Sequence, residues 1–188
     1  MTTPKIAHDE DVVLSSRARL ARNIAGMPFV HVASEDQRRD VIARLLPSLT
    51  GTASAEPTTW TDLETAPKQR RRMLFEQHLI SRQHADAKGP RGVAVAEDEA
   101  MSVMINEEDH VRMHAIASGL QPGLCFERIR NFDVAIEPLI GWAFHERWGY
   151  QSACPTNTGT GIRFSAMLHL PALRLTRELE KVRQAAKD

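Results

Sequence analysis

The chain has 188 residues, 42% of them hydrophobic and 26% charged, so it can bury the core of a single domain. Its 24 Lys and Arg residues balance its 24 Asp and Glu residues, which argues against nucleic acid or an anionic membrane as a partner. Two cysteines, Cys125 and Cys154, are too few for a secreted disulfide framework and too far apart for a zinc or redox pair. The sequence has a polar start and no apolar run of about eighteen residues, so we expect a cytoplasmic protein.

The first predicted strand covers residues 12–23, where β-branched residues open the segment and polar residues then alternate with small ones. This alternation places Arg17 and Arg19 on the same face of the strand. The next predicted element is a helix that Ser34 can cap and that runs to Leu49, because apolar residues recur at spacings of three and four. Its apolar stripe indicates packing rather than chemistry.

Residues 50–57 are rich in Thr, Ser, Ala and Gly and predict a loop. Thr61 and Glu64 then have the spacing of a capping box, and a second helix is predicted at about residues 67–81. The first turn of that helix, residues 68–72, is strongly basic. A basic first turn opposes the helix dipole unless an acidic partner or a ligand compensates.

A hairpin is predicted from the apolar runs at 93–96 and 101–105, which flank an acidic turn at 97–99. The charged segment 106–110 interrupts the second run, and an alternating pattern resumes at 111–113. Binding and catalytic residues are often found on such polar tips at the ends of hydrophobic strands.

The apolar spacing of residues 121–148 predicts a long amphipathic helix that covers a sheet and breaks at Pro138 or Gly141. A loop at 153–163 then feeds an alternating strand at 164–170.

Residues 171–188 predict a final charged helix, with Arg174 and Glu178 spaced for an ion pair. Strands followed by separate helices favour an α+β architecture, with residues 1–188 as a single domain.

Four arginines are candidates for binding phosphate groups: Arg17, Arg19, Arg112 and Arg163. Guanidinium groups are forked and permanently charged, which suits phosphate oxygens. Phosphoryl transfer from ATP requires such cations, a positioned acceptor and usually a base. Taken singly, each arginine is more typical of a solvated surface residue or a structural ion pair, so the pattern as a whole carries the hypothesis.

Four segments occur in the order of a known family: SSRARLARN at 15–23, EQHLIS at 76–81, MINEEDHVR at 104–112, and ACPTN at 153–157 with its continuation to Arg163. Together they closely resemble the phosphagen kinases, the ATP:guanido phosphotransferase family, and within that family the bacterial protein arginine kinases. The match extends from residue 12 to about residue 175.

The resemblance implies an α+β guanido kinase catalytic domain, similar to glutamine synthetase, with an antiparallel sheet flanked by helices. It also implies that ATP binds with its phosphates on the arginines, and that Mg²⁺ arrives with the nucleotide. The positions that correspond to the family's ATP contacts are Ser15, Ser16, Arg17, Ala18, Arg19, His78, Arg112, Arg163, Phe164, Ser165, Ala166 and Met167.

The same resemblance implies two catalytic residues. Glu108 corresponds to the carboxylate that holds the guanidinium acceptor, and Cys154 to the active-site cysteine beside it. A guanidinium keeps its proton up to about pH 12, so a carboxylate is suited to hold it bidentately and to accept or steer that proton. Asn106, Glu107 and Asp109 are then supporting residues.

Without the resemblance, these residues have other interpretations. The acidic run at 107–109 is also typical of a solvated turn or a divalent-ion site. Cys154 is equally a small buried thiol, and His78 a packing histidine. The loop at 156–161 lacks the Walker lysine and is not a P-loop.

Two departures from the family pattern stand out. Phe164 replaces a residue that is usually small, so we expect a bulky ring near the nucleotide. The family's catalytic domain continues with an Arg-Gly-rich loop that bears a second acceptor-binding glutamate and another phosphate-binding arginine. Nothing after Leu170 resembles that segment, so we expect residues 1–188 to form a truncated catalytic domain.

The sequence therefore favours an enzyme that phosphorylates arginine side chains of proteins, alone or completed by a companion chain. The alternative is a catalytically inactive nucleotide-binding regulatory module. A kinase of small guanidino compounds is less favoured, because those enzymes carry a helical domain ahead of the catalytic domain.

Overall fold

The computed structural model describes residues 12–50 and 56–185, so most of the loop predicted at 50–57 lies outside the described residues. The strands are β1 (Val13–Arg22), β2 (Thr58–Asp62), β3 (Gly92–Ala96), β4 (Met101–Ile105), β5 (Val111–Ser118), β6 (Phe144–His145), β7 (Gly149–Tyr150) and β8 (Ile162–Leu168). The helices are α1 (Glu35–Thr50), α2 (Lys68–Glu76), α3 (Arg82–Asp86), α4 (Pro122–Ile140), α5 (Pro171–Leu175) and α6 (Leu179–Ala185).

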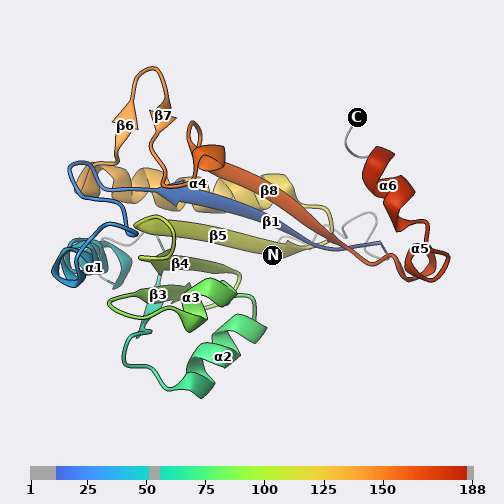
Figure 1. Cartoon of the computed structure of the whole chain (residues 1–188), viewed down its shortest axis with the longest axis horizontal. Helices are drawn as coiled ribbons and strands as arrows, with labels where there is room; N and C mark the ends of the chain where they lie inside the picture. The colour runs from blue at the N-terminus through green and yellow to red at the C-terminus, as the bar shows by residue number, and fades with distance from the viewer. Residues whose placement is uncertain (1–11, 51–55, 186–188) are drawn as a thin grey trace, which may run out of the picture.

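Six of the strands form one antiparallel sheet in the order β2-β3-β4-β5-β1-β8 (Figure 1). The predicted hairpin of β3 and β4 is confirmed, and the charged segment at 106–110 is the turn that joins β4 to β5. The first predicted strand, β1, lies between β5 and β8. The α+β fold with an antiparallel sheet flanked by helices is therefore confirmed.

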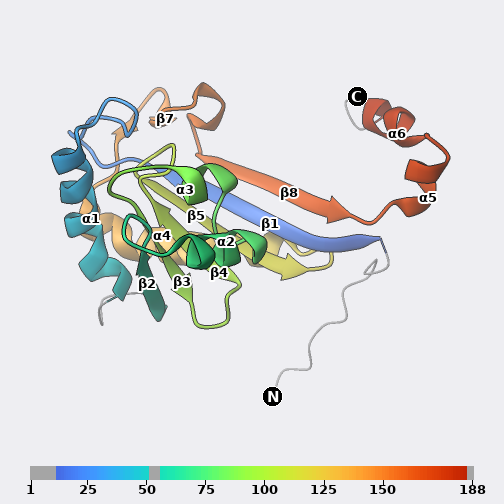
Figure 2. The same cartoon turned by 60° about the horizontal axis from the view of Figure 1, so that its bottom comes forward.

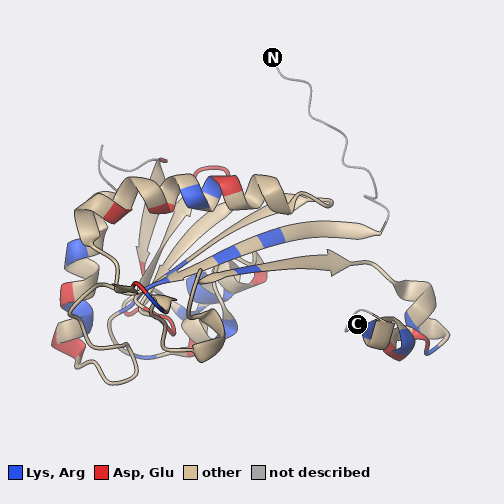
Figure 3. Cartoon of the chain, turned by 90° about the horizontal axis from the view of Figure 1, so that it is seen from above, with Lys and Arg blue, Asp and Glu red and all other residues tan. Residues whose placement is uncertain are grey.

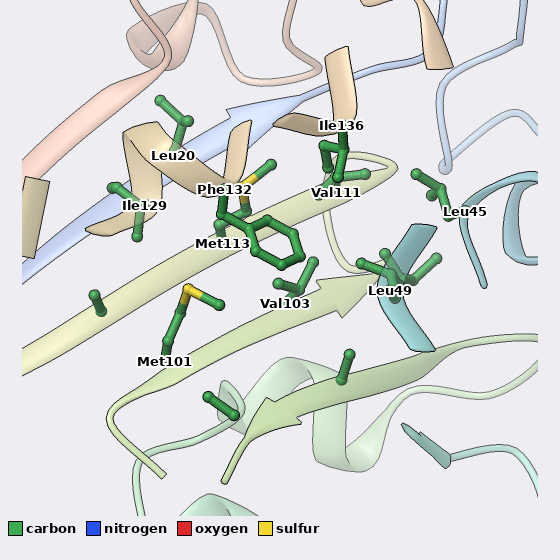
Figure 4. Close-up of a cluster of buried hydrophobic side chains, with 14 of the residues drawn as sticks. Leu20, Leu45, Leu49, Met101, Val103, Val111, Met113, Ile129, Phe132 and Ile136 are labelled. Carbon is green, nitrogen blue, oxygen red and sulfur yellow. The ribbon is translucent and has the colours of Figure 1, made fainter. Parts of the chain in front are cut away.

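One face of the sheet is covered by α1 and α4, and the main hydrophobic core lies between them and the strands (Figure 4). Phe132 of α4 and Leu45 of α1 are almost fully buried there, against Val103 and Met113 of the sheet. Ser34 caps α1 as predicted, because its hydroxyl accepts a hydrogen bond from the Gln37 amide at 3.2 Å.

The opposite face is covered only in part (Figure 2). Helix α2 and the segment that leads to α3 pack on β3 and β4 through a second buried cluster, made of Leu63, Leu74, Leu79, Ile80, Val93, Val95 and Met104. No residue of β1, β5 or β8 belongs to that cluster. The same face of these three strands is left for polar side chains.

The helix predicted at 67–81 ends early, and a separate short helix, α3, follows beyond the predicted range. Helix α2 ends at Glu76, and His78 takes a left-handed backbone with φ of 61°. Ser81 then caps α3 by accepting a hydrogen bond from the His84 amide. The predicted capping box was wrong, because Thr61 lies in β2.

The C-terminal half of the chain also differs from its prediction in two places. Helix α4 ends at Ile140 because Gly141, one of the two predicted break points, has a φ of 73°. The predicted final helix is split into α5 and α6 at Arg177, which has a φ of 61°. Because the helix is split between Arg174 and Glu178, Glu178 pairs with Lys181 at 2.6 Å and not with Arg174 as predicted.

No helix in the described parts of the chain is long and apolar enough to cross a membrane.

Candidate active site

The register of the sheet gathers the four predicted arginines on one face. Arg19 lies directly opposite Arg163 on β8, and Ala21 lies opposite Arg112 on β5. Residues that face each other across antiparallel strands point to the same side, as do alternate residues of one strand. We call the resulting surface of β1, β5 and β8 the arginine face; Figure 3 shows the basic residues along neighbouring strands.

The predicted nucleotide-binding residues divide between the two faces of the sheet. On the arginine face lie Ser15, Arg17, Arg19, Arg112, Arg163, Ser165 and Met167. On the opposite face lie Ser16, Ala18, Phe164 and Ala166. The side chains of this second group do not line the arginine face, because a strand alternates its side chains.

Two of these displaced residues have other partners. The Ser16 hydroxyl donates to the Gly119 carbonyl at 2.7 Å and accepts from the Gln121 amide at 2.9 Å, so it fixes the entry to α4. The Phe164 ring packs edge-on against Phe126 of α4, with ring centroids 5.9 Å apart. The Phe164 ring therefore lies on the face opposite the arginines, and its closeness to a nucleotide stays a prediction.

The arginine face has a surplus of positive charge. Burial, together with the charge of Arg112, lowers the pKa of Arg17. Burial also lowers the pKa of Arg19, with further contributions from Arg112, Arg163 and Arg17. The buried Nε of Arg19 has no hydrogen-bond partner in the part of the chain that the structure describes. Mutual repulsion between cations and an unused buried donor are properties that suit a surface to binding an anion.

Glu107 holds Arg112 in this cluster. Its carboxylate is 2% exposed and accepts from Arg112 Nη1 at 2.7 Å, from the Ser81 hydroxyl at 2.6 Å and from the Glu108 amide at 3.0 Å. Burial opposes the charge on Glu107, but Arg112 and the Ser81 hydrogen bond outweigh it, and the net effect lowers the pKa of the carboxyl. Glu107 is thus a supporting residue, as predicted.

Glu108 and Cys154 line one small cleft with the arginines. The cleft has a volume of about 70 Å³, and its walls include Arg19, Arg112, Arg163, Glu108, Cys154 and Asn157. Sequence reasoning did not single out Asn157 or Ser81 for the site, although both lie within the four matching segments.

A wider cleft of about 460 Å³ reaches Glu108 from another side. Its walls include Arg38, Gln83, Lys88 and Ala153. Glu108 therefore borders both clefts, with Arg19, Arg112 and Arg163 in the smaller one.

His78 lies close to the arginine face through its backbone. Its backbone is hydrogen-bonded to the ring of His114, which faces Arg19 across β1 and β5. The His78 side chain itself is exposed.

The residues that the structure describes contain no group of three or more His, Cys, Asp or Glu side chains that could hold a metal ion. The arginines and a single cleft carboxylate are suited to a polyanion and a cationic acceptor rather than to a resident metal.

Comparison with known proteins identifies the family. The family model for the ATP:guanido phosphotransferase C-terminal catalytic domain matches residues 41–188. The chain belongs to this family.

Among the relatives of the chain, the protein-arginine kinase of Halothermothrix orenii is 41% identical over 174 residues. That match covers 93% of this chain and 50% of the relative. The protein-arginine kinase of Clostridium novyi is 41% identical over 179 residues, which cover 92% of this chain and 51% of the relative. The chain thus spans about half the length of these curated relatives.

Solved structures agree on the fold. The crystal structure of lombricine kinase superposes with a TM-score of 0.78 and 26% identity, over 89% of this chain and 50% of that one. The taurocyamine kinase of Schistosoma mansoni with bound transition-state-analogue components gives a TM-score of 0.81 at 22% identity, over 96% of this chain and 26% of that one. The predicted guanido kinase catalytic-domain fold is confirmed.

Proposed function

We propose that this domain transfers a phosphoryl group from ATP to the guanidinium of arginine side chains in proteins. Arg17, Arg19, Arg112 and Arg163 would bind the phosphates, and Glu108 would hold the acceptor. Ser15, Ser165, Met167 and His78 are proposed to border the nucleotide. The 36–41% identity to several protein-arginine kinases supports this choice of acceptor.

The observation that carries the proposal is the pairing of unlike charges across the smaller cleft. Three arginines and Glu108 line the same space of about 70 Å³. Arginines attract the phosphates of ATP, whereas a lone carboxylate attracts a guanidinium. The two reactants would therefore meet between the arginines and Glu108.

The position of Glu108 suits a protein substrate. The wider cleft also reaches Glu108, none of the four arginines of the arginine face lines it, and it has room for a side chain that enters from a polypeptide. An arginine side chain is long and flexible, so it can reach Glu108 while its backbone stays at the mouth of the cleft.

In the proposed reaction, one guanidinium nitrogen attacks the γ-phosphorus of ATP while the bond to the ADP oxygen breaks. The attacking nitrogen loses a proton, which Glu108 accepts or steers away. Arginines on the phosphate oxygens stabilise the charge of the transferring group. Mg²⁺ bound to the nucleotide would neutralise further phosphate charge, and the absence of a dedicated metal site in the described residues is compatible with a metal that arrives on ATP.

The outer edge of β8 supports the expectation that residues 1–188 form part of a larger catalytic unit. Among the described residues, no strand pairs with that edge. Phe164, Met167 and Leu168 on β8 are 46–48% exposed. We propose that a further segment, from the same protein or from a companion chain, pairs there, because bare apolar edges favour the addition of a strand.

A nucleotide-binding module without turnover is the second candidate. It is favoured by the contrast between the three arginines of the smaller cleft and Glu108, which is the only carboxylate among the described residues that line it. On a separate point, we propose that the protein is cytoplasmic. Its two free cysteines support this location, because thiols stay reduced there.

The test is transfer of acid-labile labelled phosphate from Mg-ATP to an arginine-rich protein. Glu108→Gln is expected to abolish the labelling and to leave ATP affinity within a few fold, because the glutamine cannot take a proton or pair with a cation. Glu127→Gln, an exposed change on α4, is the matched control and keeps full labelling. Labelling that survives Glu108→Gln excludes Glu108 from the mechanism, and tight ATP binding without any labelling selects the second candidate.

A further inference from the structure

We infer that Asp109 is a positioning residue that holds Cys154 at the smaller cleft. Asp109 is 2% exposed and accepts three hydrogen bonds within 2.7 Å. Oδ1 accepts from the Asn23 side-chain amide at 2.6 Å and from the Ala153 backbone amide at 2.7 Å. Oδ2 accepts from the Ser152 hydroxyl at 2.7 Å.

These bonds lead directly to the thiol. The Ser152 hydroxyl, fixed by Asp109, accepts a hydrogen bond from the Cys154 amide at 3.2 Å. The Cys154 sulfur in turn lies 3.0 Å from the Thr156 hydroxyl. Asp109 therefore restrains the two residues that precede Cys154 and, through Ser152, the backbone of Cys154 itself.

Asn23, which also donates a hydrogen bond to Asp109, is itself held in place. Asn23, at the end of β1, donates to Asp109, donates to the Gln151 carbonyl at 3.0 Å and accepts from the His110 amide at 2.9 Å. One buried amide thus joins three segments that are far apart in the sequence. Because Glu108 is the neighbour of Asp109, this network also sets the separation between Glu108 and Cys154.

This arrangement uses both acceptor oxygens of Asp109. A carboxylate can accept all three hydrogen bonds, whereas an asparagine amide has a single acceptor oxygen. In Asp109→Asn the new NH₂ group would face the Ser152 hydroxyl, whose proton would lose its acceptor. The loop that carries Cys154 would then open more often, and the thiol would react faster.

The experiment measures alkylation of Cys154 by iodoacetamide, followed by mass spectrometry of the peptide that contains it. Asp109→Asn loses one hydrogen bond and is expected to raise the rate about fivefold, whereas Ser152→Ala loses two and is expected to raise it at least as much. Asp40→Asn makes the same chemical change at an exposed aspartate of α1 and is the matched control, with a rate within about twofold of the unmodified chain. Ser152→Ala decides the question if Asp109→Asn does not fold.

An unchanged alkylation rate in both folded variants would overturn the inference. In phosphoryl transfer, which rests on the proposed function, Asp109→Asn is expected to lower kcat and to leave KM for ATP unchanged. A change in KM alone would place Asp109 in nucleotide binding instead and would also overturn the inference. The thiol measurement needs no kinase activity, so failure of the proposed function leaves it decisive.

Discussion

Arg112 and Arg163 provide a paired test of the arginine face. Both are proposed to bind ATP phosphates, but their surroundings differ. Arg163 is exposed, whereas Arg112 is ion-paired at 2.7 Å to the buried carboxylate of Glu107. Replacing each with alanine should weaken ATP binding in both variants and destabilise the fold in one.

The expected magnitudes follow from these contacts. A charge-assisted hydrogen bond contributes about 1.5 to 3 kcal/mol, so each substitution should raise the Kd for ATP about 10- to 100-fold. Arg112→Ala also leaves Glu107 without its cation. The Arg112 side chain is 22% exposed and Glu107 keeps its bonds from Ser81 and the Glu108 amide, so we expect a stability loss of about 2 kcal/mol, below the usual cost for a fully buried pair.

Calorimetric titration with Mg-ATP and urea denaturation measure the two effects separately. Arg130→Ala is the matched control, because Arg130 is an exposed arginine on α4, which packs on the opposite face of the sheet. ATP affinity that is unchanged in both Arg112→Ala and Arg163→Ala would refute the nucleotide site. A loss of the same size in Arg130→Ala would show a general charge effect instead.

Two further predictions concern stability. Burial lowers the pKa of His84 to about 4 and of His114 to about 3, so both rings are neutral in the fold and take up protons near pH 6.5 when it unfolds. Stability is therefore complete above that pH, and the free energy of unfolding should fall by about 2 kcal/mol from pH 6 to pH 5 in urea titrations. Gly161→Ala should lower Tm more than Gly26→Ala: both glycines have positive φ, but only at Gly161 would the new Cβ lie 2.6 Å from the Ala21 carbonyl oxygen.

Each of these two stability predictions would be contradicted by one specific result. A free energy of unfolding that stays constant from pH 6 to pH 5 would mean that the two histidines are not neutral and buried as described. Equal melting temperatures for Gly161→Ala and Gly26→Ala would mean that the approach of residue 161 to β1 relaxes without cost.

Alternation along the strands made the arginine face predictable, whereas the family resemblance alone did not separate the two faces of the sheet. The run from Ser15 to Arg19 was transferred as a block, and so was the run from Arg163 to Met167. Successive residues of a strand point to opposite faces, so part of each block lies on the face opposite the arginines. Strand periodicity, applied to the blocks, separates Ser16 and Phe164 from the arginines without a structure.

Other features depend on contacts that sequence spacing does not reveal. The second helix ends early because His78 adopts a left-handed backbone and Leu79 and Ile80 pack on the sheet. The sequence alone does not indicate which of the three adjacent acidic residues at 107–109 pairs with Arg112. Asp109 meets Ser152 and Ala153 across more than forty residues of sequence, in a loop with no periodic pattern.

The turn between β4 and β5 explains how three adjacent acidic residues acquire three roles. Asn106 has a φ of 59°, and its backbone amide donates to the His110 carbonyl at 2.9 Å, which closes the turn tightly. In a tight turn, successive side chains diverge instead of alternating across a sheet. Glu107 thus points to Arg112, Glu108 to the clefts and Asp109 to the loop of Cys154. A shift of this turn by one residue would exchange these partners. A substitution that relaxes the backbone of Asn106 should therefore impair both ATP binding and the protection of the Cys154 thiol. Glu107→Gln should impair ATP binding alone, and Asp109→Asn should impair thiol protection alone.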